Sequence, residues 1–212
     1  MTIEEGMVTF PVPWHPLVEI TQMGRLNYEQ RETKKIILGT HTGTHVDAPR
    51  HFIKDGMTVE DILLEQLCGP ALLVDFSYLP EFYEITKKDI IDKLNNKKPK
   101  KIILRYGWDK KVHTNDYYVS HPFLSTEASQ YLVDIGVKLV AQDTPMPDNP
   151  KNGKGCPIDS PNHHIFLGNN CILVEYLINL DKISKEEVDL FVLPLKIKGG
   201  DGAPARCIVI EN

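Results

Sequence analysis

The segment GTHTGTHVDAPRHF, residues 39–52, holds the densest group of chemically reactive side chains in this chain of 212 residues. His41, His45, Asp47 and His51 fall within eleven positions, although the whole sequence contains only eight histidines. Imidazole nitrogens and carboxylate oxygens together form sites that bind zinc or manganese and leave positions open for water. The segment therefore predicts a divalent metal site, with a coincidental grouping in a loop as the alternative.

The backbone around these residues is expected to be extended. The spacing of His41 and His45 would suit a helical zinc motif, but Gly43 and the threonines around it disfavour a helix. We expect a strand that runs into a turn at residues 42–44. Side chains two positions apart on a strand point to the same side, so His45 and Asp47 would lie together. The turn would bring His41 back to the same point.

His51 follows the stiff Ala48-Pro49 pair, four positions beyond Asp47. Two roles are open for it. It is either a further metal ligand or a general acid and base, for which an unperturbed imidazole pKa of about 6.5 is suitable.

The remaining ligands are expected from a distant part of the chain. His163 and His164 follow a polar, Pro- and Gly-rich loop at 143–162, and a loop of this length is usually functional or mobile. Two adjacent histidines cannot easily face one ion, so one of them is the candidate. Glu175 interrupts the apolar run 171–177. A carboxylate there must be paired, bound to a cation, or exposed at the end of a strand.

The elements that would position these residues alternate between helices and short buried strands. The predicted strands span residues 35–39, 71–76, 101–105, 137–141, 171–175, 189–194 and 205–210. The predicted helices span residues 58–67, 86–94 and 125–135, with a short helix or turn at 184–188 and a loop-rich start over residues 1–34. This alternation is typical of an α/β or α+β layered fold. The length favours one domain over residues 1–212.

Composition excludes several classes of partner. A net charge of −5 gives no electrostatic footprint for nucleic acid or for an anionic membrane surface. The four cysteines, at positions 68, 156, 171 and 207, form no close pair, which indicates a reduced, cytoplasmic chain without a zinc finger or thioredoxin motif. The N-terminus lacks the pattern of a signal peptide, and no apolar run approaches the roughly 20 residues of a membrane helix.

Several blocks of the sequence resemble a known family. HTGTHVDAPRHF (41–52) resembles the H-x-G-T-H-x-D-x-P-x-H signature of the metal-dependent cyclase family, which includes bacterial kynurenine formamidases and isatin hydrolase. Three further blocks are similar to family segments in the same order: RYGW (105–108), DTPMPD (143–148) and LPLKIKGGDGAPARCIVI (193–210). His163 precedes Glu175 by twelve positions, as in the second ligand block of the family. FPVPWHP (10–16) departs from the family's Y-P-G-D-P-like segment, which leaves the substrate open.

The resemblance implies an α/β protein with the family's single-domain, swivelling β/β/α layered fold, assembled as a homodimer or homotetramer. It implies one or two divalent ions per chain, zinc or manganese, with Asp47 shared if two bind. The implied ligands are His41, His45, Asp47, His163 and Glu175. His51 matches the position credited with acid and base catalysis, and in members with two metals it also lies against a metal.

The function expected on these grounds is a metal-dependent hydrolase that cleaves a small amide, with arylformamidase (kynurenine formamidase-like) activity as the specific hypothesis. A metal-activated water would attack the carbonyl, with His51 as acid and base. Alternatives are a lactone or lactam hydrolase or cyclase of the same family, and a non-catalytic metal-binding protein.

Four residues outside the motif have two interpretations each. Trp14, Phe52 and Trp108 are candidates for aromatic walls of a substrate pocket, or for packing in the core or an interface. Arg105 is a candidate for orienting a substrate carboxylate, or for a structural salt bridge. The glycines of residues 199–202 indicate a tight turn and not a phosphate loop.

Overall fold

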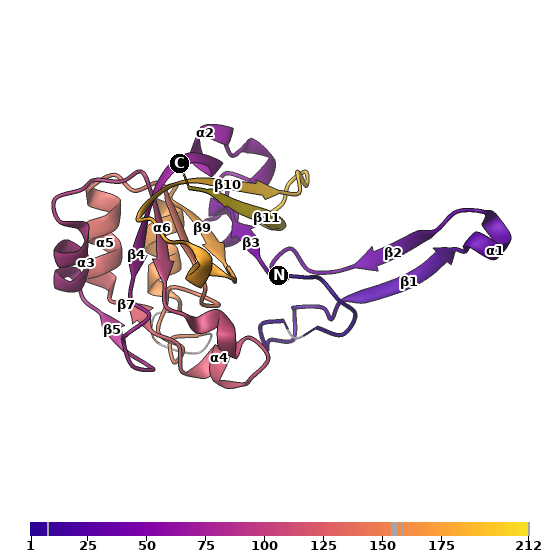
Figure 1. The fold of residues 1–212 in the computed structure, drawn as a ribbon, viewed down its shortest axis with the longest axis horizontal. Coiled ribbons are helices and arrows are strands. Elements are labelled where there is room, and N and C mark those ends of the chain that lie inside the picture. The colour runs from indigo at the N-terminus through magenta and orange to yellow at the C-terminus, as the bar shows by residue number, and fades with distance from the viewer. Residues whose placement is uncertain (8, 154–156, 158, 212) are drawn as a thin grey trace.

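A computed structural model of the chain shows a β-barrel flanked by helices and a long hairpin that projects away from this body (Figure 1). The structure describes residues 1–7, 9–153, 157 and 159–211. The strands are β1 (Glu19–Gly24), β2 (Thr33–Ile37), β3 (His45–Asp47), β4 (Cys68–Asp75), β5 (Glu84–Ile85), β6 (Lys101–Arg105), β7 (Phe123–Leu124), β8 (Leu139–Gln142), β9 (Ile172–Glu175), β10 (Glu187–Pro194) and β11 (Gly202–Ile210).

The α-helices are α1 (Leu26–Glu29), α2 (Leu64–Leu67), α3 (Lys87–Leu94), α4 (Asp116–Val119), α5 (Thr126–Asp134) and α6 (Pro161–Gly168). Short 3-10 helices are η1 (Pro49–His51), η2 (Val59–Asp61), η3 (Trp108–Lys111) and η4 (Leu180–Lys182).

The main sheet closes into a barrel in the order β10-β11-β3-β9-β8-β6-β4. β4, β6, β8 and β9 pair in parallel, whereas β3, β10 and β11 join antiparallel to their neighbours. Helices α3, α5 and α6 lie along one side of the barrel (Figure 1). The mixed α/β architecture predicted from the alternation of elements is therefore confirmed.

Side-chain alternation along the barrel strands divides the core into two clusters. On β6, Ile103 joins the cluster inside the barrel, while Ile102 and Leu104 join the cluster between the barrel and the helices. The same period of two places Val46 of β3 and Val174 of β9 inside the barrel. The residues on either side of these valines must then point outward, and this fact positions the site described below.

Several sequence-based predictions hold closely. β6 occupies the predicted residues 101–105. Helices α3 and α5 begin directly after the caps Thr86 and Ser125, whose hydroxyls accept hydrogen bonds from the backbone N–H of Asp89 and of Ala128. Of the four cysteines, the three in the described residues are free thiols, and Cys156 lies outside the described residues.

Other predictions are wrong. The helix predicted at 58–67 is divided into η2 and α2, because Ile62 adopts an extended backbone (ψ 125°) that buries its side chain to 7% exposure. The short helix or turn predicted at 184–188 is not a helix: the N–H groups of Ser184 and Lys185 donate to the carboxylate of Glu211, and β10 begins at Glu187. Helix α6 was not predicted, because Pro161 and the preceding polar loop hide its start.

The N-terminal region is more ordered than a loop. β1 and β2 pair antiparallel, with Ile20 opposite Ile36, and α1 lies at the tip of this hairpin. We call residues 19–37 the arm; Figure 1 shows that it extends away from the barrel. The strand predicted at 35–39 thus begins earlier, as β2, and is exposed along its length. Among the described residues, no helix has the length and apolar character that crossing a bilayer requires.

Candidate metal centre

Two strands bring three of the expected ligands together. His45 of β3 is paired with Glu175 of β9, 130 positions further along the chain. Because Val46 and Val174 point into the barrel, His45, Asp47 and Glu175 point to its outer face. His45 Nε2 lies 3.1 Å from Asp47 Oδ1 and 3.6 Å from Glu175 Oε2.

His41 reaches the same point through the turn predicted at residues 42–44. Gly43 has a φ of +59°, a conformation that disfavours any side chain, and it reverses the backbone between the two histidines. The Thr44 hydroxyl donates to the carbonyl of Tyr176 at 2.6 Å and fixes the turn against the end of β9. His41 Nδ1 then lies 2.6 Å from Asp47 Oδ1.

Helix α6 contributes His163, and its first turn is fixed by Asp148. The Asp148 carboxylate accepts hydrogen bonds from the backbone N–H groups of Asn162 and His163 and lies 2.6 Å from His163 Nδ1. His163 Nε2 is thereby turned toward Asp47 Oδ2 and Glu175 Oε1, at 3.5 Å from each. His164 is exposed. Of the two adjacent histidines, His163 is therefore the one that faces the carboxylates.

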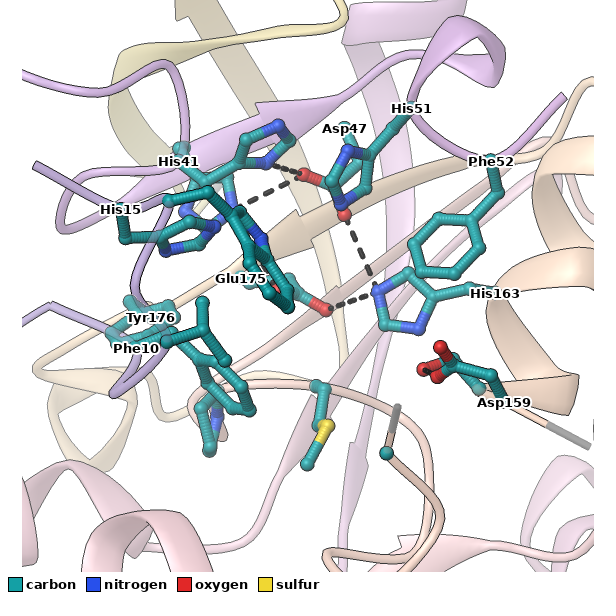
Figure 2. Close-up of a pocket in the computed structure, with 17 residues that line it drawn as sticks. Phe10, His15, His41, Asp47, His51, Phe52, Asp159, His163, Glu175 and Tyr176 are labelled. Carbon is teal, nitrogen blue, oxygen red and sulfur yellow. Dashed lines mark hydrogen bonds and ion pairs between the residues drawn. The ribbon is translucent and has the colours of Figure 1, made fainter. Parts of the chain in front are cut away.

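The donor set fits a cation. Asp47 Oδ2 and Glu175 Oε1 are buried side-chain oxygens without a hydrogen-bond partner, although their residues are only 0% and 3% exposed. Buried carboxylate oxygens are costly unless they are hydrogen-bonded or bound to a cation. Ligand atoms of His41, His45 and Asp47 lie within 4.8 Å of one another, and so do those of Asp47, His163 and Glu175. Asp47 belongs to both groups, and Figure 2 shows it between His41 and His163.

The electrostatics of the centre also indicate an excess of negative charge. Burial opposes ionisation of Asp47, but His41, His51 and His45 nearby hold its pKa well below the usual range. For Glu175, burial and the Asp47 charge raise the pKa well above the usual range. Burial lowers the pKa of His41, yet Asp47 and Asp201 raise it to about 10. Two carboxylates this close cannot both ionise without a positive partner.

His51 occupies the end of η1, beside the centre. Its ring centroid lies 3.8 Å from that of His41, and its Nδ1 lies 3.3 Å from Asp201 Oδ2. Burial is the main cause that lowers the pKa of His51, so its imidazole is neutral at pH 7 and can accept a proton. His41, His51 and Asp201 also form a group whose ligand atoms lie within 4.8 Å of one another, so both predicted roles remain open on geometry.

Two carboxylates near the centre, those of Asp201 and Asp148, were not predicted from the sequence. Asp201 lies in the turn between β10 and β11, only 2.8 Å from His41 Nε2. The glycine after it is required, because a Cβ at Gly202 would lie 2.5 Å from the carbonyl oxygen of Val46. The available signal for Asp201 was its place between glycines as the single acid of the closing segment 193–210. Asp148, the partner of His163, lay within the DTPMPD block.

Trp14, Phe52, Trp108 and Arg105 each had a substrate-binding and a structural interpretation. The structural one holds for Arg105 and Trp108. Arg105 donates to Asp75 and to the carbonyls of Leu180 and Ile183, so it forms a structural salt bridge. Trp108 is 5% exposed and donates through Nε1 to the Tyr117 carbonyl in the core. The hypotheses of a substrate-binding arginine and of a wall at Trp108 are therefore wrong.

Trp14 and Phe52 line a cavity of about 150 Å³ that opens onto the centre. Phe52 stacks on the His163 ring, with centroids 4.6 Å apart. The other described lining residues outside the centre are mostly apolar or aromatic (Figure 2): Phe10, Val12, His15, Pro145, Met146, Gly153, Asp159, Ser160 and Tyr176. The arrangement suits a flat, largely apolar molecule held with one end at the centre.

Comparison of the sequence with protein families finds a match to the model described as "Putative cyclase" over residues 1–149. Kynurenine formamidase from Salinibacter ruber is 30% identical over 198 residues, which cover 91% of this chain and 87% of that protein. Kynurenine formamidase from Bacillus anthracis is 29% identical over 178 residues, which cover 82% and 78%.

Solved structures share the fold. An isatin hydrolase bound to the product analogue thioisatinate superposes with a TM-score of 0.85 at 23% identity, covering 98% of this chain and 87% of that one. A predicted metal-dependent hydrolase from Bacillus stearothermophilus superposes with a TM-score of 0.80 at 27% identity, covering 100% and 96%. These similarities confirm the fold that the sequence resemblance implied.

Proposed function

The chain belongs to the cyclase family, and from this membership we propose that it is a metal-dependent hydrolase of small amides, with arylformamidase activity as the specific assignment. One observation carries the proposal. Asp47 Oδ2 and Glu175 Oε1 are buried without a hydrogen-bond partner and lie 3.5 Å from the same imidazole nitrogen, at the floor of a cavity with aromatic walls. The relatives named kynurenine formamidase support the choice of an N-formyl aryl amide as substrate.

The proposed ligands are His41, His45, Asp47, His163 and Glu175, with Asp47 shared if two ions bind. The donor set of imidazoles and carboxylates favours zinc first and manganese second. A divalent ion held there supplies Lewis acidity, which makes a water more acidic and polarises a carbonyl group.

In this proposal His51 carries the proton. Its Nδ1 faces the Asp201 carboxylate, which favours the tautomer with a proton on Nδ1 and leaves Nε2 as the base. Nε2 takes a proton from the water that attacks the carbonyl carbon and returns it to the nitrogen of the leaving amine. Phe52, Trp14 and the other aromatic residues hold the aryl ring and exclude bulk water from the reacting bond.

The experiment that tests this proposal combines metal analysis with turnover. Protein purified after expression with added zinc or manganese should hold one or two ions per chain, and it should hydrolyse N-formylkynurenine. Hydrolysis of isatin in preference to the formyl amide would favour the lactam-hydrolase alternative, which the isatin hydrolase fold similarity raises. Metal-free protein without either activity would contradict the proposal.

We also propose that the chain forms a homodimer or homotetramer through the arm and that it works in the cytoplasm. A two-stranded hairpin is only marginally stable by itself in water. Residues of the arm nevertheless expose large apolar side chains, including Leu26 at 65% and Ile36 at 55%. Exposed apolar residues on β10 and β11, such as Leu193 and Ile208, give the barrel a surface of matching character. A second copy of the chain is the partner that this pairing favours.

A further inference from the structure

The lip of the cavity carries one acidic residue that the proposed chemistry does not use. Asp159 lines the cavity, and Figure 2 shows it beyond His163, on the side away from His41 and His15. We propose that Asp159 selects substrates that carry an ammonium group or another N–H donor at the end opposite the scissile bond, and that it disfavours substrates whose only charged group there is a carboxylate. This inference rests on the proposed function, because the scissile bond is taken to lie at the metal centre.

The position of Asp159 is fixed by the chain around it. Ser160 has a φ of +46°, which is uncommon for a residue with a side chain. Its backbone N–H donates to the carbonyl of Asn152 at 3.0 Å, and its hydroxyl donates to Asp159 Oδ1 at 2.8 Å. Strained backbone that persists next to a cavity is typical of functional sites.

Charge at the cavity favours a positive group. Among the lining residues that the structure describes, none is lysine or arginine. The acids of this set are Asp47 and Glu175, which belong to the centre, and Asp159. A ligand carboxylate directed away from the centre would therefore face apolar walls and a like charge, whereas an ammonium group would face Asp159.

The shape of the cavity indicates how a ligand would be oriented, with one end at the metal centre and the other toward Asp159. His51 and the ligand cluster form one end, and Phe52, stacked on His163, forms a flat wall beside it. An aryl ring against Phe52 would direct its N-acyl group to the centre. A substituent on the other side of the ring would extend toward Asp159, which lies beside the same histidine in Figure 2.

The test measures binding and not turnover, so it is independent of whether the protein cleaves an amide. Three ligands that cannot be hydrolysed share a 2-aminophenyl ketone and differ at the far end: 1-(2-aminophenyl)-3-aminopropan-1-one, 1-(2-aminophenyl)butan-1-one and 4-(2-aminophenyl)-4-oxobutanoate. We expect the ammonium ligand to bind the metal-loaded protein about two- to fivefold more tightly than the neutral one, as measured by calorimetry at low salt. The carboxylate ligand should bind more weakly than both, and added salt should reduce the differences.

Variants of Asp159 test whether this residue causes the preference for the ammonium ligand. Asp159→Asn should abolish the difference between the ammonium and neutral ligands, while Asp159→Glu should retain it. Asp92→Asn, on the exposed side of α3, is the matched control and should bind like the wild type. Equal binding of the ammonium and carboxylate ligands by the wild type, or an unchanged preference in Asp159→Asn, would overturn the inference. Failure of the wild type to hydrolyse N-formyl aryl amides would instead count against the proposed function.

Discussion

The metal centre and the arm depart from the usual distribution of polar and apolar residues in opposite directions. The centre buries ionisable groups, with Asp47 at 0% and Glu175 at 3% exposure. The arm exposes apolar groups, with Met23 at 57% and Leu26 at 65%. A buried charge without a partner and a large exposed apolar surface are both costly in an isolated chain.

We propose a partner of a different kind for each region, a cation for the centre and a second copy of the chain for the arm. In the centre the proposed cation would bind the buried carboxylates. On the arm the proposed second copy would cover the exposed apolar side chains. The predictions below separate the two, because a change in one region should leave the property of the other intact.

The largest effect is expected from His51→Ala. Loss of the group that moves the proton should lower kcat by about 10²–10⁴-fold. Metal content, measured by atomic emission, should stay at the wild-type value if His51 acts only as acid and base. A fall in metal content together with kcat would instead make His51 a ligand, as its proximity to His41 and Asp201 also permits.

The adjacent histidines of α6 provide a matched pair for the next test. His163→Ala should lower metal affinity by more than the 10–100-fold that loss of an outer partner usually costs, because its Nε2 faces both carboxylate oxygens that lack a hydrogen-bond partner. His164→Ala removes the same side chain from an exposed position and should bind metal like the wild type. Equal affinities in a chelator competition assay would contradict the assigned centre.

At His121, a buried imidazole outside the centre, burial outweighs the opposing effect of the Asp148 charge on the pKa. His121 is 0% exposed, and burial lowers its pKa to about 4, whereas His41 next to Asp47 has a raised pKa. The unfolded chain therefore binds a proton at His121 more readily than the folded chain does. Its contribution to stability is complete above pH 6.5 and is lost as the pH falls toward 4, by about 3 kcal/mol.

Urea unfolding at a series of pH values measures this effect. The free energy of unfolding should fall between pH 6.5 and 4 more steeply in the wild type than in His121→Gln, which cannot titrate at that position. Parallel curves for the two proteins would show that His121 is not the titrating group. Measurements on metal-loaded protein with and without excess metal separate this effect from loss of the ion.

The smallest effect on catalysis is expected from changes in the arm. Leu26→Ser and Ile36→Ser together should weaken self-association by at least about tenfold, because they remove apolar anchors from the proposed interface. Light scattering during size-exclusion chromatography measures the mass, and metal content should not change. Thr21→Ser is the control on the same hairpin. An unchanged mass in the double variant would contradict association through the arm.

The sequence alone determined the local chemistry of the centre. His41, His45 and Asp47 were predicted to converge, since a period of two and a turn at Gly43 are local properties of the backbone. Helices with clear caps, such as α3 and α5, were also predicted closely, because a capping hydroxyl acts within one turn.

The family resemblance implied His163 and Glu175 as well, but only the tertiary structure shows how they and Asp201 come together. The pairing of His45 with Glu175 depends on the register of two strands far apart in the chain, and no local pattern encodes that register. The orientation of His163, and not His164, depends on the rotation of α6 set by Asp148. The proximity of Asp201 to His41 depends on closure of the barrel, which brings β11 beside β3. Residue types fix what a site can bind, whereas long-range packing fixes which of those residues meet.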